Sequence, residues 1–468
     1  MTAAAGAKSS FRALRTRNYR LWVSGTVVSN TGTWIQRTAQ DWLVLTSLTR
    51  HSGLAVGITI GLQFAPMLLL AGYSGVVVDR LPIRRLLVAT QSLMGATALV
   101  LGLLVITGQV QLWEVYVCAT VLGMGSALDN PARQAFVSQV VERKDVTSAV
   151  SLNTASMNIA RLVGPGVSGL LISAVGSGPS FLINAASFGA VLVALFRMNT
   201  AQLHPAKRVA RQPGQLREGL HYVRRRADLV VIFVLAGIVG TFGLNFQITN
   251  ALMASGPFHR GVKEYGLLGS MMAVGSLSAA LLAARRDRPR LTLLVAAAAG
   301  FGGFVTIAAL MPNYLTYGLF LIPVGLSSVT FLNSCNTAVQ LSTADGMRGR
   351  ILALYLAVQQ GTTPIGAPIV GWIGGEFGAR WSVLVGGLSA LACAGVVQFV
   401  LCRRSGIRVG FEAALTAAEP PPEVPLPAAA PETALSDTPL PETPVSETPL
   451  PDLPSTEGRD DNVRGDLR

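Results

Sequence analysis

A cation and an anion lie one helical turn apart in the first long apolar stretch of the chain. Arg37 and Asp41 occur within the segment WIQRTAQDWL, residues 34–43. Charged side chains are costly in lipid and mark functional sites there. Residues four apart on a helix are neighbours, so we predict that Arg37 and Asp41 neutralise each other. An aspartate in such a place is able to take up and release a proton.

The same helix face carries further polar side chains. At about 100° per residue they fall with Arg37 and Asp41 within an arc of about 140°, and Ile35 and Trp42 lie opposite. These polar residues are Asn30, Thr33, Gln36 and Gln40. So long a stripe predicts a water-filled central cavity. The alternative is an ion pair near the outer interface that only sets the tilt of the helix.

Asp41 is distinguished by elimination. The other acidic residues before position 412 lie in loops or near the ends of apolar stretches, and no histidine lies inside a stretch. Asp41 is therefore the candidate for proton coupling, with Arg37. The later stretches add further cavity candidates, which are Asn158, Arg161, Asn245 and Gln247. We expect a cavity with little net charge and hence a neutral or zwitterionic amphiphile as cargo.

A charged motif follows the second stretch, in GYSGVVVDRLPIRRLL. It contains Gly75, Asp79, Arg80, Arg84 and Arg85. The pattern resembles the loop signature G-x-x-x-D-R-x-G-x-R-R of the major facilitator superfamily, with Pro82 in place of the second glycine. A simple cluster of charges that stops translocation would explain the arginines but not the spacing of Asp79.

The fourth stretch ends in DNPARQAF, which places Asp129 and Arg133 on one helix face. The resemblance implies that Asp129 pairs with Arg84 or Arg80, and that Asp79 meets the chain near Gly349. Together these contacts would form a cytoplasmic gate. The alternative is that Arg133 only anchors the helix at the headgroups.

The fifth stretch contains GPGVSG, residues 164–169. Gly164, Pro165 and Gly169 resemble the fifth-helix motif of exporters in this superfamily, with Ser168 in place of a glycine. Proline removes a backbone hydrogen bond and glycine permits close helix packing. We therefore expect Gly164→Leu to block transport and Gly164→Ala to be tolerated.

Apolar stretches long enough to span a bilayer as helices recur along the chain. Hydrophobic residues make up 50% of its 468 residues and charged residues 13%, about half the usual share. Stretches this long exclude a membrane β-barrel. We predict twelve spans, at 20–46, 53–78, 87–107, 112–136, 147–175, 178–196, 229–254, 265–284, 291–311, 314–341, 350–375 and 380–402.

The basic residues are distributed asymmetrically over these spans. The stretch 412–468 holds twelve acidic and three basic residues, so the rest of the chain carries a net charge of +22. In the twelve-span arrangement 27 of its basic residues lie on one side and four on the other. This asymmetry predicts that both termini are cytoplasmic, and it accounts for the basic charge without nucleic acid. Arginine far outnumbers lysine, which indicates a GC-rich bacterial genome and hence a bacterial inner membrane.

Four parts are predicted along the chain. They are an N-terminal six-helix bundle, 1–196, a basic cytoplasmic linker with a short amphipathic helix, 197–228, a C-terminal six-helix bundle, 229–411, and a disordered tail rich in Pro, Glu and Thr, 412–468. GAPIVG, residues 366–371, repeats the fifth-stretch motif and indicates internal duplication. The four cysteines lack a C-x-x-C spacing and the four histidines lie in loops, so we expect no metal and no cofactor.

Longer blocks, FRALRTRNYRLW, GTWIQRTAQDWLVL, DNPARQAF and FLINAASF, resemble the branch of the superfamily with enterobactin-exporter and macrolide-efflux-like proteins. The resemblance implies an all-α membrane protein with twelve transmembrane helices in two pseudo-symmetric six-helix bundles. It also implies a monomeric secondary transporter that exports a small amphipathic molecule, a drug, siderophore or other secondary metabolite, by proton antiport. An uptake symporter and a non-transporting receptor are the alternatives. An intramembrane enzyme would need catalytic residues within the spans, and we find none.

Overall fold

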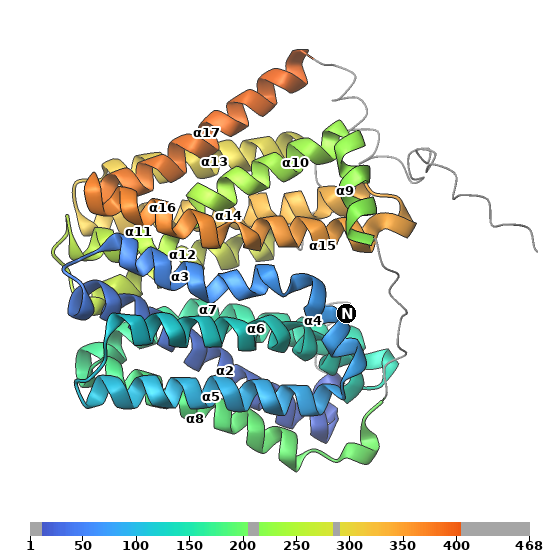
Figure 1. The fold of residues 1–468 in the computed structure, drawn as a ribbon. Helices are drawn as coiled ribbons and strands as arrows, with labels where there is room; N and C mark the ends of the chain where they lie inside the picture. The colour runs from blue at the N-terminus through green and yellow to red at the C-terminus, as the bar shows by residue number, and fades with distance from the viewer. Residues whose placement is uncertain (1–11, 205–214, 284–290, 404–468) are drawn as a thin grey trace, which may run out of the picture. The chain divides into compact units, whose positions relative to one another are not determined.

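The computed structural model describes residues 12–204, 215–283 and 291–403, and within these ranges its regular elements are all helical (Figure 1). The predicted tail and the middle of the predicted linker lie outside the described residues. The main helices are α2 Arg17–Trp42, α3 Gly53–Leu69, α4 Ala71–Arg80, α5 Ile83–Ile106, α6 Leu112–Val140, α7 Val146–Val175, α8 Ser177–Arg197, α9 Gln215–Arg225, α10 Ala227–Ile238, α11 Phe246–Ser255, α12 Val262–Ala283, α13 Leu291–Leu310, α14 Tyr314–Leu341, α15 Asp345–Gly361, α16 Thr363–Glu376 and α17 Ala379–Arg403.

Eight helical segments of the described residues are long and apolar enough to cross a membrane, and α3 with α4, bent by 62°, makes a ninth if counted together. The other predicted spans coincide with α2, α6 and the pair α15 and α16. Polar residues lower the hydropathy of α2 and α6, and the pair is interrupted at Thr362. These helices therefore combine the length of a span with the residues from which a polar interior is built.

Several helices are irregular near their middle. α2 continues into the π-helical turn η2, Leu43–Leu48. α10 continues into a second π-helical turn, η5 Val239–Gly243, and the chain leaves helical geometry at Leu244 and Asn245 before α11 begins. A break in a membrane helix leaves backbone N–H and C=O groups without their helical hydrogen bonds. Such groups are tolerated within a membrane where they line a cavity.

The helices of 12–204 pack mainly on one another, and so do those of 215–403. In the first half α2 contacts α7 and α8, and α5 contacts α6 and α8. In the second half α14 contacts α12 and α13, and α13 contacts α17. The halves meet where α3 packs on α16 and α7 packs on α12, and Figure 1 shows α3 between α6 and α16.

Small residues set both contacts between the halves. A Cβ atom on Gly53 or Gly57 would overlap the backbone of α16, at Gly371 and Ala367. A Cβ on Gly169 would lie 2.8 Å from the Val262 carbonyl oxygen of α12. Small side chains let membrane helices approach closely, so these glycines allow the two halves to come together.

The predicted amphipathic helix of the linker corresponds to α9, which packs on α15 and α10. Glu218 of α9 forms an ion pair with Arg350 of α15. The outward faces of the other helices expose large apolar side chains, such as Leu69, Phe196 and Leu310. An apolar surface of this kind requires lipid in place of water.

Candidate functional site

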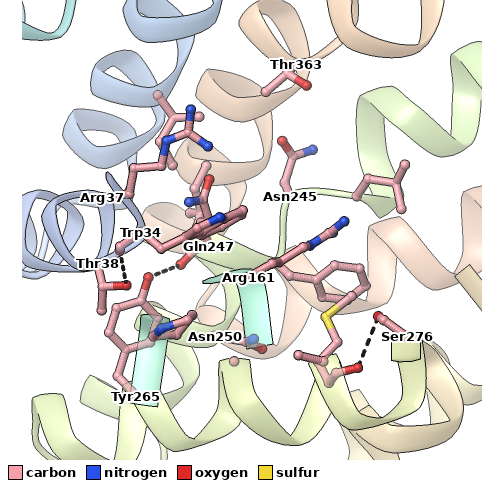
Figure 2. A pocket seen from close by; sticks show the side chains of 18 of the residues that line it. Trp34, Arg37, Thr38, Arg161, Asn245, Gln247, Asn250, Tyr265, Ser276 and Thr363 are labelled. Atoms are coloured by element: carbon pink, nitrogen blue, oxygen red, sulfur yellow. Dashed lines mark hydrogen bonds between the residues drawn. The ribbon is translucent and has the colours of Figure 1, made fainter. Parts of the chain in front are cut away.

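A cavity of about 230 Å³ lies between the two halves. α2, α3 and α7 line it from one half, and α11, α12 and the chain before α11 line it from the other, together with Thr363 of α16 (Figure 2). Its polar side chains include Arg37, Arg161, Asn245, Gln247 and Tyr265. Asn245 and Thr363 stand at the helix breaks, so the breaks contribute directly to the wall of the cavity.

Two arginines on different helices face this cavity across the same aromatic ring. The Arg37 guanidinium carbon lies 5.3 Å from the centre of the Trp34 ring, and that of Arg161 lies 5.9 Å from it. Phe64 flanks Arg37 at 5.4 Å. An aromatic face attracts a cation without using any of its N–H donors.

The guanidinium donors of these arginines lack protein acceptors. Within the described part of the chain, neither Arg37 nor Arg161 makes a hydrogen bond or an ion pair, and the Arg37 Nε is buried. The described residues that line the cavity include no aspartate or glutamate. The expectation of a cavity with little net charge is therefore wrong for its lining, because two cations face it and no carboxylate does.

Asp41 is buried behind the wall and does not line the cavity. It is 2% exposed. The Tyr265 hydroxyl lies 3.4 Å from the Asp41 Oδ2 and 3.2 Å from the Gln247 carbonyl oxygen. Trp42 stacks on the Tyr265 ring, with centroids 5.8 Å apart. Tyr265 therefore separates the carboxylate from the cavity and contacts both.

Arg37 and Asp41 interact electrostatically across one helical turn, as the sequence predicts, but they do not form a direct salt bridge. Among the described residues no contact within 4.0 Å joins their charged atoms. Arg37 turns toward Trp34 and Phe64, whereas Asp41 turns toward α12. The helical spacing brings the two side chains to one face, but packing against different neighbours separates their charged ends.

The rest of the predicted polar stripe divides between the cavities and the protein interior. Asn30 lines a second cavity, described below. Gln36 is buried and accepts a hydrogen bond of 2.5 Å from Asn184 of α8. Gln40 is also buried, and both polar atoms of its amide lack a partner within the described structure. The prediction that the whole stripe faces the cavity is wrong for Gln36, Gln40 and Asp41, which are buried. Gln36 turns to α8 and Asp41 to Tyr265 of α12.

The candidates from later helices also divide. Arg161, Asn245 and Gln247 line the central cavity, as the sequence predicts. Asn158, one turn before Arg161 on α7, is exposed but lines neither cavity. Sequence reasoning missed Tyr265, because it begins the eighth apolar stretch and resembles an interfacial aromatic residue.

A second cavity of about 200 Å³ adjoins the first. Trp34, Arg37 and Phe64 line both cavities. The second cavity lies toward the end of the molecule at which α2 begins and α4 ends, which we call the basic end because Arg17, Arg20, Arg80, Arg84 and Arg85 occur there. Trp34, Arg37 and Phe64 therefore form the wall between the two cavities.

Asp129 and Arg133 line this second cavity and belong to one network. The Asp129 Oδ2 lies 2.5 Å from the Arg133 Nε. The other oxygen, Oδ1, accepts from Thr90 at 2.9 Å and from Gln91 at 2.7 Å. Arg133 also donates to Ser29 of α2 at 3.2 Å. The network therefore ties α6 to α5 and α2.

The pairing of Asp129 with Arg80 or Arg84 is wrong in this structure. Arg84 donates instead to the Leu195 carbonyl oxygen of α8, at 2.8 and 3.0 Å. Asp79, Arg80 and Arg85 are exposed at the loop between α4 and α5. Arg133, one turn away on the same helix, satisfies Asp129, so the loop arginines are not needed.

The glycines of the fifth-stretch motif lie in close helix contacts. A Cβ on Gly164 would overlap the Cβ of Trp34. Gly169 faces the backbone of α12, and the Pro165 carbonyl oxygen lies against Gly266 of α12. The prediction that Gly164→Ala is tolerated is wrong on this geometry, because the Trp34 Cβ is fixed to the backbone and cannot move away without moving α2.

Comparison with known proteins gives three results. A family described as transmembrane secretion effectors matches residues 8–427. A staphyloferrin A transporter from Staphylococcus aureus is 23% identical over 372 residues, which cover 79% of this chain and 92% of that protein. Macrolide efflux protein A from Streptococcus pyogenes is 23% identical over 399 residues, or 81% and 94% of the two chains. The solved structure of a peptide transporter has a TM-score of 0.70 at 11% identity, covers 84% of this chain and 96% of its own, and shares the fold.

Proposed function

Because this chain belongs to the transmembrane secretion effector family, in the exporter branch of the major facilitator superfamily, we propose that it exports a small amphipathic molecule by alternating access, in exchange for protons. The observation that carries the proposal is the central cavity, with its arginines and polar groups between two halves that meet through small residues. The superfamily binds cargo at the midplane and moves one half against the other.

The arrangement that we propose counts each broken helix as one span. α3 with α4, α10 with α11, and α15 with α16 then complete twelve spans in two six-helix bundles, 1–196 and 229–411. The segment 197–228 is a cytoplasmic linker. The basic end then faces the cytoplasm, and the protein is a monomer in a bacterial inner membrane without a nucleic-acid partner.

Two observations favour export over uptake. One of the relatives named above is a macrolide efflux protein. The fifth-helix motif, Gly164, Pro165 and Gly169, is associated by resemblance with exporters, and its glycines lie at the contact of α7 with α2 and α12. An uptake symporter would share the fold but would accumulate cargo in the opposite direction.

Proton coupling is assigned to Asp41, with Tyr265 as its link to the cavity and Arg37 as the nearby cation. A tyrosine hydroxyl carries one proton and so donates to one acceptor at a time. With Asp41 ionised, Tyr265 is able to donate to the carboxylate. With Asp41 protonated, Tyr265 donates to the Gln247 carbonyl oxygen, and the carboxyl group donates to the tyrosine. Protonation of Asp41 would thus change a hydrogen bond at the helix break that lines the cavity.

The gate at the basic end is proposed to include Gly75, Asp79, Arg80, Arg84 and Arg85, with the Asp129 and Arg133 network inside it. This assignment rests on the loop signature and on the position of the second cavity. It differs from the sequence prediction only in the partner of Asp129.

The test has two stages. A screen of toxicity and exported metabolites in cells with and without the gene identifies a cargo. Inverted membrane vesicles then measure whether this cargo accumulates when the vesicle interior is acidified. Accumulation that requires the gradient supports proton-coupled export. Accumulation only in right-side-out vesicles would support the uptake symporter, and specific binding without exchange of labelled cargo would support a receptor.

A further inference from the structure

We propose that the central cavity selects an organic anion, held by Arg37 and Arg161 with Trp34 as the platform between them. The inference rests on the proposed transport function and names the substrate class of the same site. It replaces the neutral or zwitterionic cargo expected from the sequence. The cargo is a small molecule with an acidic group, such as a carboxylate, and an apolar or aromatic part.

The first argument is the balance of hydrogen-bond donors. Each guanidinium group carries five N–H donors and accepts none. The described part of the chain supplies neither Arg37 nor Arg161 with an acceptor, although both lie within membrane-embedded helices. Arg37 is half-buried and Arg161 is exposed where it lines the cavity, so their donors are open to a ligand that enters it. Carboxylate oxygens match a guanidinium group in a two-bond geometry.

The second argument is the way the arginines are held. Both guanidinium carbons lie within 6 Å of the Trp34 ring centre, at 5.3 and 5.9 Å. Contact with an aromatic face uses the flat side of the guanidinium group and leaves its N–H edge free. Trp34 therefore positions two cations without consuming the donors that a ligand requires. Its ring also offers an apolar surface to the rest of the cargo.

The third argument is that no acidic side chain among the described lining residues competes with a ligand for the two arginines. None of the described lining residues is an aspartate or glutamate. Asp41, the acidic residue of α2 that lies one turn after Arg37, is buried and covered by Tyr265. Asp129 is bonded to Arg133, Thr90 and Gln91 in the other cavity. A cationic cargo would meet two like charges in the central cavity, whereas an anion would meet none.

The remaining lining fits an amphiphile. Phe64, Met272 and Ala273 supply apolar surface, and Asn245 and Ser276 supply neutral polar groups (Figure 2). A pocket that is mostly apolar with a few convergent polar groups is typical of small-molecule sites. An anionic lipid headgroup would satisfy the same arginines, so the experiment must separate a soluble anion from a lipid.

The experiment measures the binding of three related fluorescent probes to the full chain in phosphatidylcholine nanodiscs. Dansylglycine is anionic, dansylglycinamide is neutral, and dansylcadaverine is cationic. Dansyl emission excited through the protein's tryptophans reports binding, with empty nanodiscs as the baseline. We expect dansylglycine to bind at least about tenfold more tightly than the neutral probe, and the cationic probe to bind most weakly; a tenfold change corresponds to about 1.4 kcal/mol.

The variant Arg161→Gln should weaken dansylglycine binding about tenfold and dansylglycinamide binding less, so that the preference between the two probes falls. A melting temperature equal to that of the unchanged protein shows that the variant is folded. Arg161→Lys should retain part of the preference, because it keeps the charge but loses the planar fork. Arg50→Gln is the matched control, since Arg50 is exposed in the loop before α3. It should bind all three probes as the unchanged protein does.

Failure of dansylglycine to bind, equal binding of the anionic and neutral probes, or a preference that survives in Arg161→Gln would each overturn the inference. Nanodiscs containing phosphatidylglycerol provide the lipid comparison. If this lipid abolishes dansylglycine binding, the arginines hold a headgroup and the small-molecule assignment is wrong. The assay uses no proton gradient, so a failure of proton-coupled export in vesicles contradicts only the proposed function.

Discussion

At the scale of single residues, Asp41 is the group to which we assign proton coupling. Asp41→Asn keeps the size of the side chain and its contact with Tyr265 but cannot exchange a proton. We predict that the variant loses uphill efflux driven by a pH gradient and retains cargo binding and downhill exchange. The measurement is efflux from proteoliposomes with and without an imposed gradient.

The matched variant Tyr265→Phe removes the hydroxyl that contacts both Asp41 and the Gln247 carbonyl oxygen. It should lower gradient-driven efflux more than downhill exchange. If Asp41→Asn still concentrates cargo against its gradient, the coupling site lies elsewhere and Asp41 has a structural role.

Asp129 has a different role at this scale, because its charge is compensated by Arg133 within the protein. Asp129→Asn leaves Arg133 without its anion in a site where the two side chains are only 4% and 12% exposed. Breaking a buried pair in this way costs about 3–5 kcal/mol, so we predict a lower melting temperature in detergent. Glu142→Gln is the control, since Glu142 pairs with Lys144 at 2.6 Å on the exposed surface. Equal melting temperatures for the two variants would contradict the prediction.

The sequence predicted residue types better than residue positions. Arg161, Asn245 and Gln247 line the cavity because polar side chains in a membrane helix have few other places to lie. Gln36 and Asp41 were misplaced because their partners, Asn184 and Tyr265, are 148 and 224 residues away in the chain. Helical periodicity gives the face of α2, but it does not say which neighbouring helix covers that face.

At the scale of helices, the contact of α7 with α2 depends on Gly164. Replacement by alanine usually stabilises a helix by about 1 kcal/mol, but here the added Cβ would overlap that of Trp34. Overpacking costs about 1–3 kcal/mol, and moving Trp34 would disturb both cavities. We therefore predict that Gly164→Ala reduces transport and dansylglycine binding, and that Gly164→Leu abolishes both.

Gly189→Ala is the matched control for this contact. Gly189 lies in α8, and a Cβ there would meet no atom within 4 Å. The variant should transport and melt as the unchanged protein does, or melt slightly higher. Transport by Gly164→Ala at the level of Gly189→Ala would show that α2 and α7 do not need this close approach.

The length of each apolar stretch predicted that a helix is present, but it did not predict where a helix is interrupted. The sequence predicts one continuous span over 53–78 and another over 350–375, but the structure divides the first between α3 and α4 and the second between α15 and α16. Hydropathy averages over a window and does not respond to a single bend. The break at Thr362 lies between Gly361 and Pro364, which stands in the first turn of α16, so it has a local signal. Asn245 is not a helix breaker by type, and hydropathy alone does not locate that break.

At the scale of the whole molecule, the positions of the closest contacts indicate which side is open. Gly53 and Gly169 make their close contacts with the other half away from the basic end, whereas the second cavity lies between the central cavity and that end. We infer that this conformation is open toward the basic end. The proposed orientation places that end in the cytoplasm, and a labelling experiment tests both proposals.

The last prediction concerns access to Met67, which lines the second cavity. In a protein whose native cysteines are replaced, Met67→Cys should react with a membrane-impermeant thiol reagent in inverted vesicles and not in right-side-out vesicles. His51→Cys, in the loop before α3, should show the opposite pattern.

If Asp79 stabilises the state closed to the cytoplasm, Asp79→Asn should increase the labelling rate at Met67→Cys and slow turnover, because the populations of the two states shift. Labelling of Met67→Cys from the outside would reverse the proposed orientation. Unchanged labelling together with unchanged transport in Asp79→Asn would remove Asp79 from the gate and leave the Asp129 and Arg133 network as its remaining candidate.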